Sequence, residues 1–180
     1  MTVPNLITAI RIILAPIFVI YLIDEQFVSA LIVFFLCGIS DGLDGMVARL
    51  FNQKSRLGTY LDPLADKILL VSAFVALSVM GYLPSWLTVT VIARDILILL
   101  GVFVLFMNHL EFTIKPSALS KITTCLQFIS IIVILAQNIL SLHPMLIRVL
   151  FYLTGLFTIS SGLHYMHYWF KIMGEGGSGK

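Results

Sequence analysis

The sequence predicts an all-α, polytopic membrane protein with six transmembrane helices. Of its 180 residues, 59% are hydrophobic and only 11% are charged, and the mean hydropathy is +1.05. Soluble domains carry about 25% charged residues. Six apolar stretches of roughly 20 residues, the length that crosses a bilayer, account for most of the chain. We therefore expect a single membrane domain over residues 1–173, followed by a flexible Gly-rich tail over residues 174–180.

The first half of the chain is expected to begin with a juxtamembrane amphipathic segment. Asn5, Thr8 and Arg11 recur at helical spacing among apolar residues, which is typical of a helix that lies at the membrane surface. This segment leads into the first spanning helix. Polar residues at 24–26 and 52–56 separate the next two apolar stretches. The expected helices of this half cover residues up to 22, 27–50 and 57–82.

Helix-breaking residues divide the second half into three further helices. Residues 81–85 interrupt an uncharged run that is too long for one span. A polar loop at residues 108–116 and the pair His143-Pro144 mark the later boundaries. Aromatic residues between 164 and 169 are interpreted as a belt at the membrane interface. The expected helices cover residues 86–107, 117–140 and 146–172.

The charges between the helices predict an orientation. Basic residues gather on one side of the expected bundle, so the positive-inside rule places both termini in the cytoplasm. No secretory or transit segment is recognisable, which favours a bacterial inner membrane. The basic side carries Arg11, Arg49, Lys54, Arg56, Lys115, Lys121, Lys171 and Lys180, and the other side carries Asp24, Glu25 and Arg148.

Four of the nine acidic residues lie between two long apolar flanks. Asp41 and Asp44 are three residues apart and Asp62 and Asp66 are four apart, so each pair lies on one face of a helix. Carboxylates at membrane depth are costly unless positive charge compensates them. Hard carboxylate oxygens favour Mg²⁺ or Mn²⁺ over zinc. The sequence thus predicts a divalent-metal site near the cytoplasmic ends of the second and third helices.

A metal-bound carboxylate cluster at a membrane surface indicates phosphoryl transfer, because paired divalent ions bridge phosphate oxygens and stabilise attacking and leaving groups. A site within the membrane indicates a lipid phosphate as substrate. A cation transporter is the alternative from another class, since intramembrane aspartates also line ion paths. Against it, the first, fifth and sixth expected helices contain no acidic residue. The net charge of +2 gives no indication of a nucleic-acid partner.

The aspartate stretch resembles the signature of the CDP-alcohol phosphatidyltransferases, D-x2-D-G-x2-A-R-x8-G-x3-D-x3-D. Every fixed position of the signature is met, by Asp41, Asp44, Gly45, Ala48, Arg49, Gly58, Asp62 and Asp66. The resemblance implies an enzyme in which an alcohol hydroxyl attacks the β-phosphorus of a CDP-alcohol and CMP is released. It implies two bound metal ions, Mg²⁺ or Mn²⁺, and a general base.

The resemblance assigns roles to the signature residues. The expected metal ligands are the four aspartates, and Asp66 is also the expected catalytic base that takes the hydroxyl proton. The expected CDP-lipid-binding residues are Asp44, Gly45, Ala48, Arg49 and Gly58. The small residues leave room for the nucleotide, and Arg49 neutralises phosphate charge.

The remainder of the chain resembles the branch of phosphatidylglycerophosphate synthases and the related cardiolipin synthases, which implies CDP-diacylglycerol as donor. The resemblance rests on residues 4–8 with Arg11, on residues 61–67 and 92–95, and on residues 120–124 with Gln127. Glycerol 3-phosphate is the first expected acceptor. Asp95 and Ser120 depart from the synthase pattern, which often has Glu and Gly there, and residues 94–95 with 114–117 lean toward cardiolipin synthases. Phosphatidylglycerol is therefore the alternative acceptor, with inositol phosphate and serine behind it.

Arg94 and Lys121 are cations within apolar helices, where a charge must face a partner or a cavity. We expect both to bind the phosphate of the acceptor, because guanidinium and ammonium groups are strong phosphate ligands. The alternative is that they neutralise buried carboxylates such as Asp95. Assembly as a homodimer is left open by the sequence.

Overall fold

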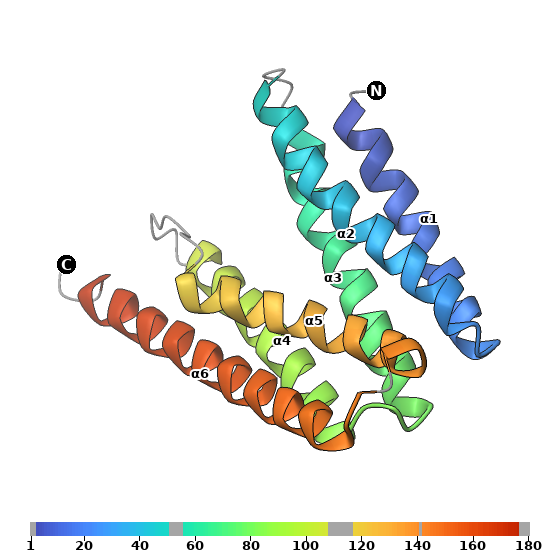
Figure 1. Cartoon of the computed structure of the whole chain (residues 1–180). Coiled ribbons are helices and arrows are strands. Elements are labelled where there is room, and N and C mark those ends of the chain that lie inside the picture. The colour runs from blue at the N-terminus through green and yellow to red at the C-terminus, as the bar shows by residue number, and fades with distance from the viewer. Residues whose placement is uncertain (1–2, 51–55, 108–116, 141, 177–180) are drawn as a thin grey trace. The chain divides into compact units, whose positions relative to one another are not determined.

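The computed structural model contains helices and no strands within the residues that it describes, which confirms the all-α fold class (Figure 1). It describes residues 3–50, 56–107, 117–140 and 142–176. Within these ranges, the side chains of residues 3–10, 39, 41–50, 56–66, 102–103, 105–106, 138, 140 and 171–176 lie outside the description. The helices are α1 (Val3–Ile23), α2 (Phe27–Leu50), α3 (Arg56–Val79), α4 (Ser85–Met107), α5 (Ala118–Leu140) and α6 (Pro144–Gly176).

The helix boundaries follow the breaks expected from the sequence within a few residues. α1 runs without interruption from Val3 through Pro16, so the N-terminal segment and the first apolar stretch form one helix. α6 continues to Gly176, beyond the expected end at residue 172. Polar and helix-breaking residues therefore predicted where each helix ends, and the length of each apolar stretch predicted how far each helix extends.

Two helices are long and apolar enough to cross a membrane when only the described residues are considered. They are Ala118–Gln137 in α5 and Pro144–Phe170 in α6. Shorter apolar stretches occur at Arg11–Ile23, Phe27–Gly38 and Lys67–Val79. The membrane character expected from composition is supported by these helices, and the number of six spans stays a prediction.

The chain divides into two compact units. The first contains α1, α2, α3 and the segment Ile131–Leu142, which includes the last part of α5. The second contains α4, the first part of α5 up to Ser130, and α6. The aspartate signature belongs to the first unit, and Arg94 and Lys121 belong to the second.

Aromatic and aliphatic side chains at helical spacing build the core of the first unit. α1 packs against both α2 and α3. Phe18 and Leu22 are fully buried on one face of α1, and the Phe18 ring centroid lies 5.5 Å from that of Phe34 on α2. Phe74 and Leu77 are fully buried on α3. Van der Waals packing of this kind drives the association of helices within a membrane, so this core orders the two helices that carry the signature.

The same C-terminal motif ends α1 and α3. After α3, the Tyr82 N–H donates to the Leu77 carbonyl at 2.9 Å, and the Gly81 N–H donates to the Ser78 carbonyl at 3.1 Å. Gly81 has a φ of +82°, a left-handed conformation that glycine adopts without a Cβ penalty. Glu25 takes the equivalent place after α1 with a φ of 57°. Both turns were expected as helix breaks. In both, backbone N–H groups of the turn donate to carbonyls that have no hydrogen-bond donor within the helix.

α4 packs against α6 where glycine allows an indole ring to approach the backbone. A Cβ built on Gly155 would lie 2.6 Å from Cζ3 of Trp86, and one built on Gly101 would overlap the Trp169 ring. Small residues of this kind let helices of membrane proteins come close together. Glycines on both helices therefore define the seam of the second unit.

Replacing Gly155 by alanine is expected to lower the free energy of unfolding by about 1–3 kcal/mol, because the new methyl group must displace the Trp86 ring. Gly162→Ala is the matched control on the same helix, since its Cβ would lie at an ordinary 3.7 Å from Cγ of Arg94. Thermal unfolding of the two purified variants in detergent measures the difference. Equal stability of both variants would contradict this description of the seam.

Candidate functional site

The signature residues lie on two helices of the first unit. The positions of Asp41, Asp44, Gly45, Ala48 and Arg49 belong to α2, and those of Gly58, Asp62 and Asp66 belong to α3. Their backbone is helical, as the three- and four-residue spacing of the carboxylates requires. The side chains of all eight lie outside the described residues, so the assignment of metal ligands, nucleotide contacts and base stays a prediction. Among the described side chains, no group of three or more His, Cys, Asp or Glu is placed to hold a metal ion.

The donor set of the signature fits a hard divalent cation. Four carboxylates on two helices supply oxygen ligands alone, the set that Mg²⁺ and Mn²⁺ prefer. Asp41 and Asp44 would hold an ion from α2, and Asp62 and Asp66 would do so from α3. Such an ion would also compensate the cost of four negative charges within apolar helices.

The second unit encloses Arg94 in a polar cluster. Arg94 is only 4% exposed, and its Nη1 donates to Oδ1 of Asp95 at 2.8 Å in a buried ion pair. Nη2 donates to the hydroxyl oxygens of Ser120 on α5 and of Ser161 on α6, the latter at 3.1 Å. The guanidinium carbon also lies 6.0 Å from the centre of the Tyr165 ring. Arg94 thus joins three helices through one side chain.

The hydrogen bonds of Arg94 limit what its charge can do. A guanidinium carries five N–H donors. Three are used on Asp95, Ser120 and Ser161, and the buried Nε has no hydrogen-bond partner in the described part of the chain. A buried cation requires a counter-charge, which Asp95 supplies here. The arrangement orients the guanidinium firmly, and its net charge is balanced within the protein.

Lys121 differs from Arg94 in its surroundings. It follows Ser120 in the first turn of α5, which begins where the Ser117 hydroxyl accepts the Ser120 N–H at 3.1 Å. Its side chain is exposed. The structure therefore brings Arg94 to the start of the helix that carries Lys121, but it buries one predicted phosphate ligand and exposes the other.

A ladder of polar contacts continues from this cluster along α5 and α6. The Thr123 hydroxyl donates to the Phe157 carbonyl at 3.1 Å, and Nε2 of Gln127 donates to the Thr158 hydroxyl at 3.3 Å. The Ser130 and Thr154 hydroxyls lie 2.9 Å apart. All of these groups belong to the second unit. The polar residues of this stretch of α5, Thr123, Gln127 and Ser130, thus join α5 to α6.

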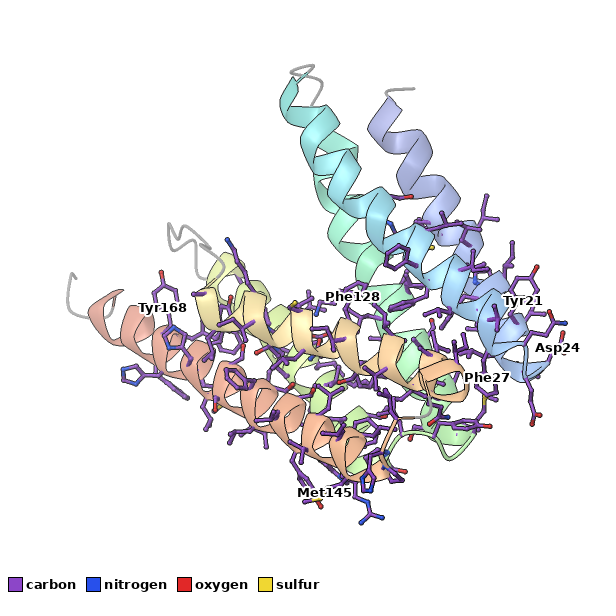
Figure 2. The ribbon with its side chains drawn as sticks, viewed as in Figure 1. Tyr21, Asp24, Phe27, Phe128, Met145 and Tyr168 are labelled. Atoms are coloured by element: carbon purple, nitrogen blue, oxygen red, sulfur yellow. The ribbon has the colours of Figure 1, made fainter. Side chains whose placement is uncertain are left out.

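Sequence reasoning missed Ser161 and misjudged Tyr165. Tyr165 was expected in an interfacial belt, yet it is only 8% exposed and its hydroxyl accepts the Ser117 N–H at 3.5 Å. Tyr168, three residues on, is exposed as a belt residue should be (Figure 2). The available signal was the spacing of Thr154, Thr158, Ser161 and Tyr165, which places four polar side chains on one face of α6.

Arg11 was also misjudged. The sequence placed it on the polar face of a surface helix, but its side chain is only 1% exposed and lies inside the first unit. The reason is that α1 packs against α2 and α3, which turns this position toward protein. A buried arginine in the same unit as the signature is an additional candidate for the site's electrostatics.

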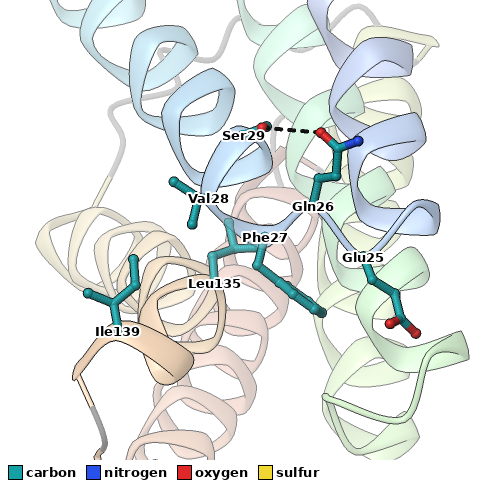
Figure 3. Close-up of a pocket in the computed structure, with 7 residues that line it drawn as sticks. All are labelled: Glu25, Gln26, Phe27, Val28, Ser29, Leu135 and Ile139. Carbon is teal, nitrogen blue, oxygen red and sulfur yellow. Dashed lines mark hydrogen bonds between the residues drawn. The ribbon is translucent and has the colours of Figure 1, made fainter.

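A separate cavity of about 350 Å³ opens in the first unit, between the α1–α2 turn and the last part of α5 (Figure 3). Leu135 and Ile139 of α5 face Val28 of α2 across it, and the Ser29 hydroxyl donates to Oε1 of Gln26 at 3.4 Å. The Glu25 carboxylate points away from the two α5 side chains (Figure 3). The polar and apolar groups that line this cavity do not point toward a common centre, so we assign the cavity no role.

The model of the CDP-alcohol phosphatidyltransferase family matches residues 1–163 of the chain. The match includes both signature helices and the Arg94 cluster up to Ser161. The chain therefore belongs to the CDP-alcohol phosphatidyltransferase family, which confirms the resemblance seen in the aspartate signature. It is a member of a family of phosphotransferases of phospholipid biosynthesis.

Its relatives include synthases of two kinds. The chain is 35% identical to human "Cardiolipin synthase (CMP-forming)" over 93% of its own length and 61% of the relative. It is 34% identical to a Drosophila melanogaster "Probable cardiolipin synthase (CMP-forming)" over 96% of its length and 60% of the relative. It is 32% identical to the Aquifex aeolicus "CDP-diacylglycerol–glycerol-3-phosphate 3-phosphatidyltransferase" over 77% of its length and 78% of the relative. The chain thus spans about three fifths of the length of the first two relatives.

Proposed function

We propose that this protein transfers a phosphatidyl group from CDP-diacylglycerol to a hydroxyl of phosphatidylglycerol, forming cardiolipin and releasing CMP. The observation that carries the acceptor is the similarity to cardiolipin synthases, which extends over nearly the whole chain. The Arg94 cluster agrees with this acceptor. A phosphodiester has a single negative charge, whereas a phosphomonoester such as glycerol 3-phosphate has almost two at neutral pH. Asp95 neutralises the charge of Arg94, which leaves the single positive charge of the exposed Lys121. This charge matches the single negative charge of a phosphodiester.

Glycerol 3-phosphate, the acceptor first expected from the sequence, is the second candidate. It is favoured by the similarity to the Aquifex enzyme, because that alignment covers most of both chains. Either acceptor brings a phosphate and a free hydroxyl to the same metal-dependent chemistry.

The proposed reaction uses the signature residues in fixed roles. Asp66 takes the proton of the acceptor hydroxyl. The oxygen of that hydroxyl forms a bond to the β-phosphorus of CDP-diacylglycerol, and the bond from that phosphorus to CMP breaks. Two Mg²⁺ or Mn²⁺ ions, when bound by the four aspartates, supply the positive charge that phosphoryl transfer requires. Gly45, Ala48 and Gly58 leave room for the nucleotide, and Arg49 with Asp44 contacts it.

The proposed setting is the cytoplasmic face of a bacterial inner membrane, crossed by all six helices. The asymmetry of basic residues supports this orientation. It gives the signature access to CDP-lipid from the bilayer and lets CMP leave into water.

The test is CMP release by the purified protein with CDP-diacylglycerol and Mg²⁺, offered one acceptor at a time. We expect release with phosphatidylglycerol and the appearance of cardiolipin by mass spectrometry. Release with glycerol 3-phosphate alone would overturn this acceptor and favour the second candidate. Release with neither, but with inositol 1-phosphate or serine, would overturn both.

Removal of divalent ions is expected to stop the reaction. With EDTA, CMP release should fall to background, because the carboxylate cluster loses the divalent metal ions that supply positive charge to the reaction. Added Mg²⁺ or Mn²⁺ should restore it. Restoration by Zn²⁺ alone would contradict a site built from hard oxygen ligands.

Lys121→Gln is expected to raise the KM for the acceptor about tenfold, the effect of losing one charge-assisted contact. The KM for CDP-diacylglycerol and the kcat should change little, since the contact is made by the acceptor alone. Steady-state kinetics with each substrate varied in turn measure the difference. An equal rise of both KM values would remove Lys121 from the acceptor site.

A further inference from the structure

A cavity of about 430 Å³ opens at the beginning of α6, within the second unit. Apolar and aromatic groups form one part of its wall, and two nitrogen-bearing side chains form another. Figure 2 shows Met145 at this end of the helix. The lining residues are His143, Pro144, Met145, Arg148, Val149 and Tyr152. None of them takes part in the reaction proposed above.

Arg148 is the charged residue of this cavity. It is the single Lys, Arg, Asp or Glu in the apolar stretch Pro144–Phe170 that is long enough to cross a membrane. Its side chain is exposed and has no ion pair or hydrogen bond with any other described residue. A cation in a spanning helix is costly unless an anion or water compensates it. Among the residues that the structure describes, none supplies an anion to Arg148, so the compensation comes from outside this part of the chain.

His143 adds a hydrogen-bond donor beside Arg148. Its Nδ1 accepts the Met145 N–H at 3.3 Å, which fixes the ring at the start of α6. Because Nδ1 is an acceptor, the neutral ring carries its proton on Nε2, and that N–H is available to a ligand. A guanidinium and an imidazole N–H together suit the oxygens of a phosphate group.

The apolar wall is rigidly supported. Tyr152 lies one helical turn after Arg148, and its ring stacks on Trp86 of α4 with 5.7 Å between centroids and 19° between planes. Trp86 in turn lies against Gly155. Val149 and Tyr152 therefore present an ordered surface next to the cation, of the kind that suits an acyl chain below a headgroup.

We propose that this cavity binds an anionic phospholipid of the surrounding membrane, with its phosphodiester between Arg148 and His143 and an acyl chain along Val149 and Tyr152. The loop charges predict that this end of α6 lies on the membrane face opposite the aspartate signature. The bound lipid is therefore a structural or regulatory ligand and is not the reacting donor or acceptor. The site does not depend on which acceptor the enzyme uses.

Trp86 provides a direct reporter, because it contacts the Tyr152 wall of the cavity. The chain has two tryptophans, and Trp169→Phe leaves Trp86 as the single one. The full chain with this change is reconstituted in phosphatidylcholine vesicles that contain bromine-labelled phosphatidylserine or bromine-labelled phosphatidylcholine. Phosphatidylserine is chosen because it is anionic but is neither proposed acceptor. Quenching of Trp86 fluorescence then measures the relative binding constant of the two lipids.

We expect the anionic lipid to bind about fivefold more strongly than the zwitterionic lipid. Arg148→Gln should abolish this preference, whereas Arg148→Lys should retain most of it. Helical content by circular dichroism and the elution profile confirm that each variant is folded. Equal quenching by both lipids with Arg148 present, or an unchanged preference in Arg148→Gln, would overturn the proposal and leave Arg148 as a cation that reaches water.

Discussion

Replacing Asp66 by asparagine is expected to lower kcat by about a thousandfold or more, because the acceptor hydroxyl would lose the base that we propose takes its proton. The same change also removes one of four expected metal ligands. Binding of CDP-diacylglycerol should be largely preserved, since most contacts to the nucleotide and its phosphates are assigned to other signature residues. CMP release at saturating substrate and a separate equilibrium binding measurement distinguish the two effects.

Asp24→Asn is the matched control for this experiment. Asp24 is exposed in the turn after α1 (Figure 2), and it lies outside the signature. Its replacement should leave CMP release unchanged. Substantial activity in the Asp66 variant would show that another group takes the proton, whereas loss of activity in both variants would indicate a general effect of removing acidic charge.

Replacing Arg94 by glutamine is expected to lower the free energy of unfolding by about 3–5 kcal/mol, because the buried carboxylate of Asp95 then loses its ion pair with Arg94. The variant also loses the hydrogen bonds from Nη2 to Ser120 and Ser161, which join α4 to α5 and α6. Thermal unfolding in detergent measures the loss. The double variant with Asp95→Asn should recover much of it, since the buried carboxylate that lost its ion pair is then replaced by a neutral amide.

Kinetics of the same variant separate a structural role from acceptor binding. If Arg94 contacts the acceptor phosphate, the acceptor KM rises far more than the KM for CDP-diacylglycerol. Arg94→Lys keeps the charge but loses the fork that reaches both hydroxyls, so it should fall between the wild type and the glutamine variant. Destabilisation with equal effects on both KM values would assign Arg94 to the structure of the second unit alone.

The order and extent of the helices followed from the sequence. The polar turn at Glu25, the break at Gly81 and the pair His143-Pro144 are local signals, and each ends or begins a helix where expected. A helix boundary depends on a few neighbouring residues, which is why it is readable without tertiary information. The aspartate signature is local in the same sense, and it identified the family that the match over residues 1–163 confirms.

The surroundings of Arg94 did not follow from the sequence. Arg94 was expected to bind an acceptor phosphate, and its neighbour Asp95 was considered as the alternative partner. The hydrogen bond to Ser161 joins residues 67 positions apart, and no period or motif connects them. The distinction between the buried Arg94 and the exposed Lys121 likewise depends on which helix faces are covered.

By itself, the sequence determined the all-α membrane class, the helix boundaries and the family to which the signature belongs, because hydrophobic length, helix breakers and carboxylate spacing are properties of short segments. Only the tertiary structure decided that Arg11 is buried, that Tyr165 faces Arg94, and that Arg148 lines a cavity without an ion pair to any described residue. Burial and pairing arise when helices distant in the chain pack together, and the free energy of a charged side chain depends on those neighbours more than on its own segment.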